Sequence, residues 1–547
     1  MSFPWLTTIG VVPLVGALLV WLVPTSRPLL AKQLALVASL IPFALTVAMA
    51  FRFDNDAAEQ FQFAEKHVWI EQFGVSYALG VDGISLVLLA LATILVPLVI
   101  IASWNDPEAT GRGTPREFFA LILLLEVTMV GVFAATDVFL FYVFFEALLI
   151  PSYFLIGRFG GPQRSYAAVK FLLYSLFGGL IMLAALIGLY VASGDELGAG
   201  TFDFSALVGL ELDPATEKLL FLGFFTAFAI KAPMWPVHTW LPDAATEARP
   251  GVAVLLVSVL DKVGTFGMIR LCLPLFPDAS RYFAPLVITL AVISIIYGAL
   301  LAIGQSDMMR LIAYTSISHF GFIVLGIFAF TTQSQSGATL YMVNHGFTTA
   351  ALFLVIGFLV SRRGSRRIAD YGGVQKVAPV LAGIFLIAGL SSLALPGLSS
   401  FISEFLVLVG SFSRYPVAAG IATFGIVLAA LYILIMYQRT MTGPVREGVE
   451  GVTDLKGREL AALTPLIAVI IALGFVPQVV LNVINPAVER TMEQTGNTDP
   501  APDVAPVAET ADDDKTEAVD ESADVSAEHS AADDESHAGA ETEGATP

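Results

Sequence analysis

The sequence is poor in cysteine and in charge. Its 547 residues include one cysteine, Cys272, which lies inside an apolar run. A single thiol forms no intramolecular disulfide, and it excludes a cysteine-rich iron–sulfur or zinc site. Charged residues make up only 14% of the chain, against roughly a quarter of a soluble domain. We therefore expect any associated redox chemistry to take place in another subunit.

The sequence is instead rich in long hydrophobic runs. Hydrophobic residues make up 56% of the sequence. They gather in runs of about 20 residues, the length at which a helix crosses the ~30 Å hydrocarbon layer of a bilayer. We predict an all-α integral membrane protein of about fourteen transmembrane helices, in contact with lipid. The predicted spans are 5–23, 32–51, 76–102, 117–135, 137–157, 166–192, 219–238, 251–273, 283–303, 311–330, 338–360, 378–411, 416–437 and 460–482.

Negative charge is concentrated at the C-terminal end. The formal net charge is −19, and residues 501–547 contain fifteen Asp or Glu and one Lys. Segment 496–547 holds almost no large apolar residue, so we expect a solvated, disordered tail there. An acidic tail of this kind does not predict a nucleic-acid partner.

Positive residues are divided unevenly between the two sets of alternating loops. The set that starts with the first loop holds eighteen Lys and Arg, and the opposite set holds five. Because cytoplasmic loops carry the excess of Lys and Arg, the first set is predicted to be cytoplasmic. Both termini are then predicted to lie on the outer side.

Five ionisable side chains lie deep inside predicted spans: Lys231, Lys262, Glu126, Glu146 and Glu404. A charge at the bilayer centre costs at least about 2.5–3.5 kcal/mol, and such groups pair with one another or line a hydrated path. A structural ion pair between Glu146 and Lys231 is one interpretation, but it leaves the other three charges unexplained. Lysine also suits proton transfer, because its proton affinity responds to burial and to a nearby carboxylate.

Three histidines lie at span depth or at span ends: His238, His319 and His345. Each one alone can be interpreted as a helix cap or as a hydrogen bond between helices. Together with the lysines they are typical of a proton relay, because neutral imidazole accepts and donates protons at physiological pH. No two of them have the spacing of metal ligands. Arg270 lies near enough to a helix end for its head group to reach the membrane interface.

Prolines interrupt two of the predicted spans. Pro233 and Pro236 fall in the seventh span and Pro396 in the twelfth, so both spans are expected to be broken helices. Proline kinks are common in membrane helices, but these two spans also carry Lys231 and Glu404. Their separation by five spans predicts two inverted five-helix repeats, spans 4–8 and 9–13. The predicted organisation is N-terminal helices at 1–116, proton-channel units at 117–274 and 275–440, a C-terminal transmembrane helix at 441–495 and the tail at 496–547.

Several segments resemble the antiporter-like membrane subunits of respiratory complex I, over about residues 75–440. These segments are 144–151 (FFEALLIP), 227–233 (AFAIKAP), 238–244 (HTWLPDA), 305–307 (QSD) and 312–319 (IAYTSISH). Around Glu404, the sequence Ser403-Glu404-Phe405 is similar to the M-type subunit, whose central group is glutamate. The L- and N-type subunits and the subunits of sodium/proton antiporters are expected to have lysine there.

The resemblance implies a proton-translocating membrane subunit of NADH:quinone oxidoreductase in a bacterial plasma membrane. It implies L-, N- and K-type membrane neighbours, with FMN, iron–sulfur clusters and quinone held by partner subunits and no cofactor in this chain. It also implies that a conformational and electrostatic change is received at Glu146–Lys231 and that Glu404 releases protons outside. The implied relay residues are Glu146, Lys231, Lys262, His319 and Glu404, with Glu126, His238 and His345 as further candidates.

Some features depart from the resemblance, and other functions compete with it. Asp261 stands where an aliphatic residue is usual, Ala245 where histidine is frequent, and Arg310 near a common lysine. A sodium/proton antiporter or membrane-bound hydrogenase subunit shares the expected fold, but Glu404 argues against it. A membrane scaffold without ion conduction does not explain five buried charges. A self-contained enzyme is not expected, because the sequence contains no cofactor-binding motif.

Overall fold

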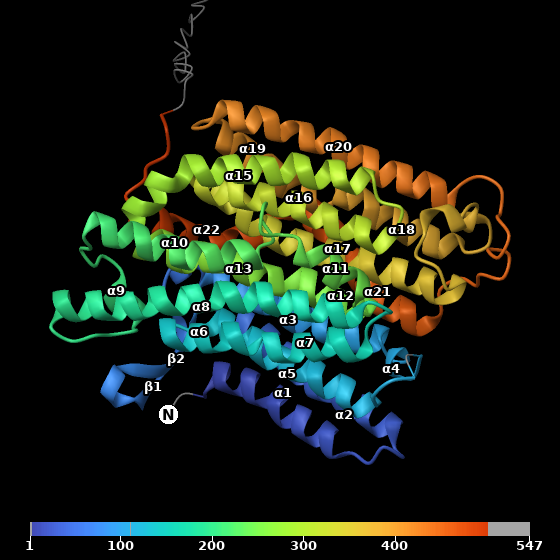
Figure 1. Cartoon of the computed structure of the whole chain (residues 1–547), viewed down its shortest axis with the longest axis horizontal. Coiled ribbons are helices and arrows are strands. Elements are labelled where there is room, and N and C mark those ends of the chain that lie inside the picture. Colours follow the sequence, from blue (N-terminus) through green and yellow to red (C-terminus); the bar gives the residue numbers. More distant parts are fainter. Residues whose placement is uncertain (1–2, 110, 502–547) are drawn as a thin grey trace, which may run out of the picture. The chain divides into compact units, whose positions relative to one another are not determined.

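The computed structural model describes residues 3–109 and 111–501, which are mostly helical (Figure 1). The N-terminal elements are α1 (Trp5–Leu22), α2 (Pro28–Ala50), β1 (Gln62–Ile70), β2 (Val75–Val81), α3 (Gly83–Ala102), α4 (Asp106–Ala109) and α5 (Pro115–Ala134). The next are α6 (Val138–Ala147), α7 (Leu149–Phe159), α8 (Arg164–Leu197), α9 (Phe204–Leu207), α10 (Pro214–Lys231), α11 (Trp240–Glu247), α12 (Pro250–Leu255), η3 (Leu256–Leu260), α13 (Asp261–Gly267), η4 (Met268–Cys272) and α14 (Leu273–Leu275). The last are α15 (Pro277–Ile303), α16 (Met308–Phe328), α17 (Thr332–Arg363), α18 (Pro379–Ser392), α19 (Ser399–Phe412), α20 (Pro416–Met441), α21 (Gly457–Phe475) and α22 (Gln478–Gln494).

The helical membrane architecture predicted from the hydrophobic runs is confirmed. Within the described ranges, twelve helical segments are long and apolar enough to cross a membrane, and they coincide with twelve of the predicted spans. Of the other two predicted spans, 378–411 is divided between α18 and α19, and 219–238 is helical only as far as Lys231, where α10 ends. The count of fourteen and the inverted repeat remain predictions. The predicted acidic tail lies almost entirely outside the described residues.

Both proline-containing spans are interrupted, as expected. α10 ends at Lys231, because Pro233 has no N–H to donate to the carbonyl oxygen of Ala229. The N–H of Met234 donates to that oxygen instead, at 3.0 Å. In the second broken span, α18 ends four residues before Pro396, and α19 begins three residues after it. The chain therefore leaves the helical path beside Lys231 and one turn before Glu404.

The eighth predicted span is helical but not uniformly α-helical. Two π-helical turns, η3 and η4, flank α13, whose seven residues form about two α-helical turns. π-Turns are rare, and they occur frequently at functional sites because they redirect the side chains that follow. Lys262 lies in α13, between the two π-turns.

Two features of the structure do not follow from the hydrophobic runs. β1 and β2 pair as an antiparallel hairpin before α3. The C-terminal part contains two helices, α21 and α22, where the sequence predicted one span at 460–482. α22 packs against α3 and α17, so it covers a helix of the N-terminal part and a helix of the second predicted unit.

The expectation that the head group of Arg270 reaches the membrane interface is wrong. Its side chain is only 7% exposed and lies 2.6 Å from the buried carboxylate of Asp82, at the start of α3. Arg270 also donates to the hydroxyl of Ser85 at 2.9 Å, and Asp82 binds Arg490 of α22 at 2.7 Å. An ion pair inside the protein replaces solvent around this guanidinium, so Arg270 joins the end of the eighth span to α3 and α22.

Candidate functional site

Glu146 and Lys231 lie at two interruptions of the helical backbone. Glu146 occupies the last turn of α6, before the short break at Leu148, and Lys231 is the last residue of α10. Their charges interact electrostatically, but no hydrogen bond or ion pair joins them among the described residues. The ammonium nitrogen of Lys231 is buried and lies 4.8 Å from the ring centre of Phe145. The two charges are thus near one another without being locked together.

A glycine makes room for the carboxylate of Glu146. Gly179 lies on α8, and a Cβ atom built at this position would lie 1.7 Å from Oε1 of Glu146. A side chain at position 179 would overlap the carboxylate in its present position, so the carboxylate occupies the space that another residue there would fill. The sequence Phe177-Gly178-Gly179 gave no indication of this role.

Lys262 is held between its own helix and α17. Its ammonium group donates a hydrogen bond of 2.7 Å to the carbonyl oxygen of Val257, in the π-turn η3. It also lies 2.7 Å from Nδ1 of His345 on α17. Because a protonated lysine has no acceptor atom, Nδ1 of His345 accepts when Lys262 is charged. The side chain is fully buried, and the ring of Phe320 lies 5.1 Å away.

A second group of contacts extends from His345 to Glu404. The rings of His345 and His319 have centres 5.3 Å apart. Nδ1 of His319 lies 2.6 Å from the hydroxyl of Tyr341, which donates to Oε2 of Glu404 at 2.9 Å. Nε2 of His319 lies 3.3 Å from the hydroxyl of Ser392, at the end of α18. These contacts connect α16, α17 and the broken span formed by α18 and α19.

Tyr341 was missed from the sequence, although a signal was present. Tyr341 and His345 are four residues apart on a predicted helix, and that spacing places both on one face. A tyrosine is common in membrane helices for other reasons, notably at interfaces. Only its place between His319 and Glu404 distinguishes it from those tyrosines.

Two of the predicted relay residues stand apart from this group. Glu126 is fully buried on α5, and neither carboxylate oxygen has a hydrogen-bond partner within the described ranges. His238 follows the break after α10, and its ring packs against the ring of Tyr297 with centres 5.2 Å apart. Neither has a hydrogen bond to the other predicted relay residues in the part of the chain that the structure describes.

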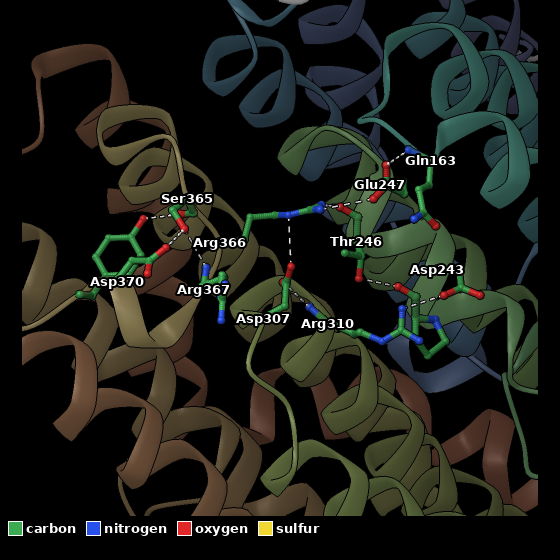
Figure 2. A network of polar contacts seen from close by, with 12 residues as sticks. Gln163, Asp243, Thr246, Glu247, Asp307, Arg310, Ser365, Arg366, Arg367 and Asp370 are labelled. Atoms are coloured by element: carbon green, nitrogen blue, oxygen red, sulfur yellow. Dashed lines mark hydrogen bonds and ion pairs between the residues drawn. The ribbon is translucent and has the colours of Figure 1, made fainter. Parts of the chain in front are cut away.

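A network of charged side chains joins α11 to the elements that follow it (Figure 2). Arg366, which follows α17, forms ion pairs with Glu247 at 3.3 Å and with Asp307 at 3.2 Å. It also donates to the carbonyl oxygen of Thr246. Figure 2 shows the Arg366 side chain extending from its own loop to the end of α11. α11 follows the first broken span and belongs to the first predicted unit, so Arg366 fixes this helix to the second predicted unit.

Asp243 of α11 takes part in a similar link. It binds Lys170 of α8 and Arg310 of α16, each at 2.7 Å. Burial raises the pKa of the Asp243 carboxyl, but the hydrogen bonds and charges of Lys170 and Arg310 outweigh burial and hold its pKa below the usual range. The carboxylate therefore remains ionised and holds the two helices together through α11.

The contacts from Lys262 to Glu404 involve groups that can both bind and release protons. They comprise an ammonium, two imidazoles, a phenol and a carboxyl group, which are buried among apolar side chains. Such groups exchange protons directly or through one water at hydrogen-bond distance. In the described ranges, no three His, Cys, Asp or Glu side chains are grouped as a metal site requires. The arrangement is suited to moving protons.

Comparison with known proteins identifies the family. Residues 17–132 match the family model described as NADH-ubiquinone oxidoreductase chain 4, amino terminus. Residues 135–430 match the model described as NADH:quinone oxidoreductase/Mrp antiporter, TM. NADH-quinone oxidoreductase subunit M of Mycobacterium tuberculosis is 56% identical over 536 residues, covering 92% of this chain and 97% of its own length. The chain belongs to the subunit M family.

Further relatives agree with this assignment. Subunit M of Rhodobacter capsulatus is 40% identical over 471 residues, covering 85% of this chain and 90% of its own. A chain of respiratory complex I from Thermus thermophilus with bound NADH has a TM-score of 0.82 at 32% identity, covering 90% of this chain and 100% of that chain. The Mrp complex from Dietzia has a TM-score of 0.80 at 22% identity, which shows the fold alone. The M-type assignment predicted from Glu404 is confirmed.

Proposed function

We propose that this family member conducts protons from Lys231 through Lys262 and the histidines to Glu404, as the M subunit of a proton-translocating NADH:quinone oxidoreductase. One observation carries the proposal. The contacts Lys262–His345, His319–Tyr341 and Tyr341–Glu404 bring proton-exchanging groups from four helices within 3 Å of one another, pair by pair. Family membership supports NADH oxidation by quinone as the reaction that drives the movement.

The proposed roles follow the positions of the residues. Glu146 and Lys231 receive the electrostatic change, because their charges interact without a fixed hydrogen bond. Lys262 passes the proton to the histidine pair, and Glu404 releases it on the outer side. Glu126 and His238 stay further candidates, since neither has a hydrogen bond to the main group among the described residues.

The proposed organisation retains the two five-helix units at 117–274 and 275–440, between the helices of 1–116 and the segment 441–495. Equivalent packing supports it: α10 packs on α8 in the first unit, and α18 and α19 pack on α17 in the second. In each unit the broken span thus lies against the long helix that precedes it. Inverted repeats of this kind place the ion site at the broken helices.

The proposed assembly contains the L-, N- and K-type membrane subunits as neighbours. FMN, iron–sulfur clusters and quinone belong to partner subunits, as expected from the single cysteine of this chain. We place the protein in a bacterial plasma membrane, with the Lys- and Arg-rich loops in the cytoplasm and both termini outside. The charged network of Arg310 and Arg366 then lies at the cytoplasmic end.

A matched set of variants in native membranes tests the proposal. Glu404→Gln and Lys262→Ala are compared with Glu211→Gln and Lys376→Ala, whose side chains are exposed. NADH-driven proton uptake by inside-out vesicles is expected to fall by about tenfold or more in the first pair and to be unchanged in the second. Wild-type proton uptake by fully assembled Glu404→Gln and Lys262→Ala complexes would refute the proposal.

A further inference from the structure

The path proposed above has a gap between its two lysines. The charge of Lys231 interacts with Glu146 and Asp261, and the charge of Lys262 interacts with Asp261. No interaction between the two lysines themselves is found among the described residues. A proton leaving Lys231 therefore needs an intermediate group before it reaches Lys262.

Asp261 lies on the face of α13 that packs against the broken end of α10. Gly264, three residues later, shares that face of the helix. A Cβ atom at Gly264 would lie 2.5 Å from the carbonyl oxygen of Phe228 and 2.6 Å from the backbone nitrogen of Ala232. Phe228 lies three residues before Lys231, and Ala232 directly follows it. Asp261 is therefore directed toward the end of α10 and its terminal lysine.

Lys262 points in another direction, because successive residues of an α-helix are about 100° apart. It binds His345, and Thr265, on the same face of α13, donates to the sulfur of Met342 at 2.9 Å. Met342 and His345 are neighbours on one face of α17. The adjacent residues Asp261 and Lys262 thus connect α13 to α10 on one side and to α17 on the other.

The carboxylate of Asp261 lacks the hydrogen bonds and ion pairs that a buried charge with a structural role has, within the described residues. It is fully buried, and neither oxygen has a hydrogen-bond partner within the described ranges. Asp82 is equally buried, but it binds two guanidinium groups and a backbone N–H. Burial of a carboxylate without hydrogen bonds is costly, so a purely structural role predicts contacts like those of Asp82. Both oxygens of Asp261 are instead free to exchange a proton.

We infer that Asp261 is a proton-carrying residue between Lys231 and Lys262. The inference rests on the proposed function and adds a group to its path. In the first step an N–H bond of the Lys231 ammonium breaks and an O–H bond forms on Asp261, leaving a neutral amine and a carboxylic acid. In the second step that O–H bond breaks and an N–H bond forms on neutral Lys262. Side-chain rotation or a bridging water completes each transfer.

Three variants in the assembled complex test the inference. Asp261→Asn keeps the size of the side chain but cannot carry a proton, Asp261→Glu keeps the carboxyl group, and Asp195→Asn alters an exposed carboxylate on α8. We expect Asp261→Asn to lower NADH-driven proton uptake by about tenfold, and Asp261→Glu to restore at least half of it. Asp195→Asn is expected to be unaffected. NADH oxidation by a soluble one-electron acceptor checks that the redox subunits are intact.

A spectroscopic measurement separates proton carriage from a structural role. The NADH-driven infrared difference spectrum is expected to contain a carboxylic C=O band that disappears in Asp261→Asn and is shifted in Asp261→Glu. Normal uptake by Asp261→Asn, or a spectrum identical to that of the wild type, would overturn the inference. If Asp261→Asn pumps normally while Lys262→Ala does not, only the inference fails. If both pump normally, the proposed function fails as well.

Discussion

Lys262 and His345 are separated by 83 residues in the chain, and their nitrogen atoms lie 2.7 Å apart. The contact joins the two predicted units, because Lys262 belongs to the eighth span and His345 to α17. It has a direction, since a charged lysine can only donate and Nδ1 of the imidazole must accept. A proton released by Lys262 therefore has an acceptor in contact, Nδ1 of His345. His345 lies beside the contacts that end at Glu404.

Replacing Lys262 by arginine distinguishes a proton carrier from a fixed charge. Arginine keeps the positive charge but does not release its proton in proteins. We expect Lys262→Arg complexes to assemble and to lose NADH-driven proton uptake, by about tenfold or more. The matched control is Lys376→Arg, at an exposed position. Retained uptake in assembled Lys262→Arg would assign this lysine a structural role.

The hydroxyl of Tyr341 is expected to be required for the last step before Glu404. Tyr341→Phe removes only the oxygen that contacts both His319 and Glu404. We expect normal assembly and a fall in the rate of NADH-driven proton uptake of about tenfold. Tyr282→Phe, whose side chain is exposed, serves as the control and should behave as the wild type. Equal rates in the two variants would remove Tyr341 from the path.

Gly179→Ala is expected to act on Glu146 without altering any charge. The new methyl group would meet Oε1 of Glu146 at 1.7 Å, so the carboxylate must move away from its present site. We expect proton uptake to fall toward the level of Glu146→Ala. Gly383→Ala is a suitable control, because a Cβ atom there contacts nothing within 4 Å and alanine favours the helix by about 1 kcal/mol. A normal rate in Gly179→Ala would show that the position of Glu146 is not critical.

Arg366 is expected to stabilise the link between α11 and the second unit. Arg366→Ala removes the ion pairs to Glu247 and Asp307 and the bond to Thr246 (Figure 2). Hydrogen bonds to charged groups contribute about 1.5–3 kcal/mol each, so we expect a lower thermal midpoint for the detergent-solubilised complex. Arg367→Ala, at the exposed neighbouring position, should change the midpoint little. Equal midpoints for the two variants would contradict the role assigned to Arg366.

The breaks in the helices could be predicted from the sequence because their cause is local. A proline removes a specific backbone N–H, so the ends of α10 and α18 follow from Pro233 and Pro396. The buried lysines and glutamates could also be identified from the sequence, because a charged residue within a long apolar run is predicted to lie inside the membrane. The π-turns beside Lys262 have no such local marker, and they were not foreseen.

The contacts of individual charges depended on helix packing. Arg270 was expected at the interface, but Asp82 and Arg490, far away in the chain, hold it inside the protein. Asp261 was noted only as an unusual neighbour of Lys262. Its direction toward Lys231 comes from the close approach of α13 to α10 at Gly264.

The sequence alone determined a helical membrane protein with buried charges on two broken spans. Both features depend on residues close together in the chain: the length of each hydrophobic run, and prolines that remove local backbone hydrogen bonds. It also determined the family, through motifs around Glu146, Lys231 and Glu404. Only the tertiary structure decided which charges meet. Contacts such as Tyr341–Glu404 depend on how separate helices rotate and approach, and that arrangement is set by side-chain packing over the whole membrane domain.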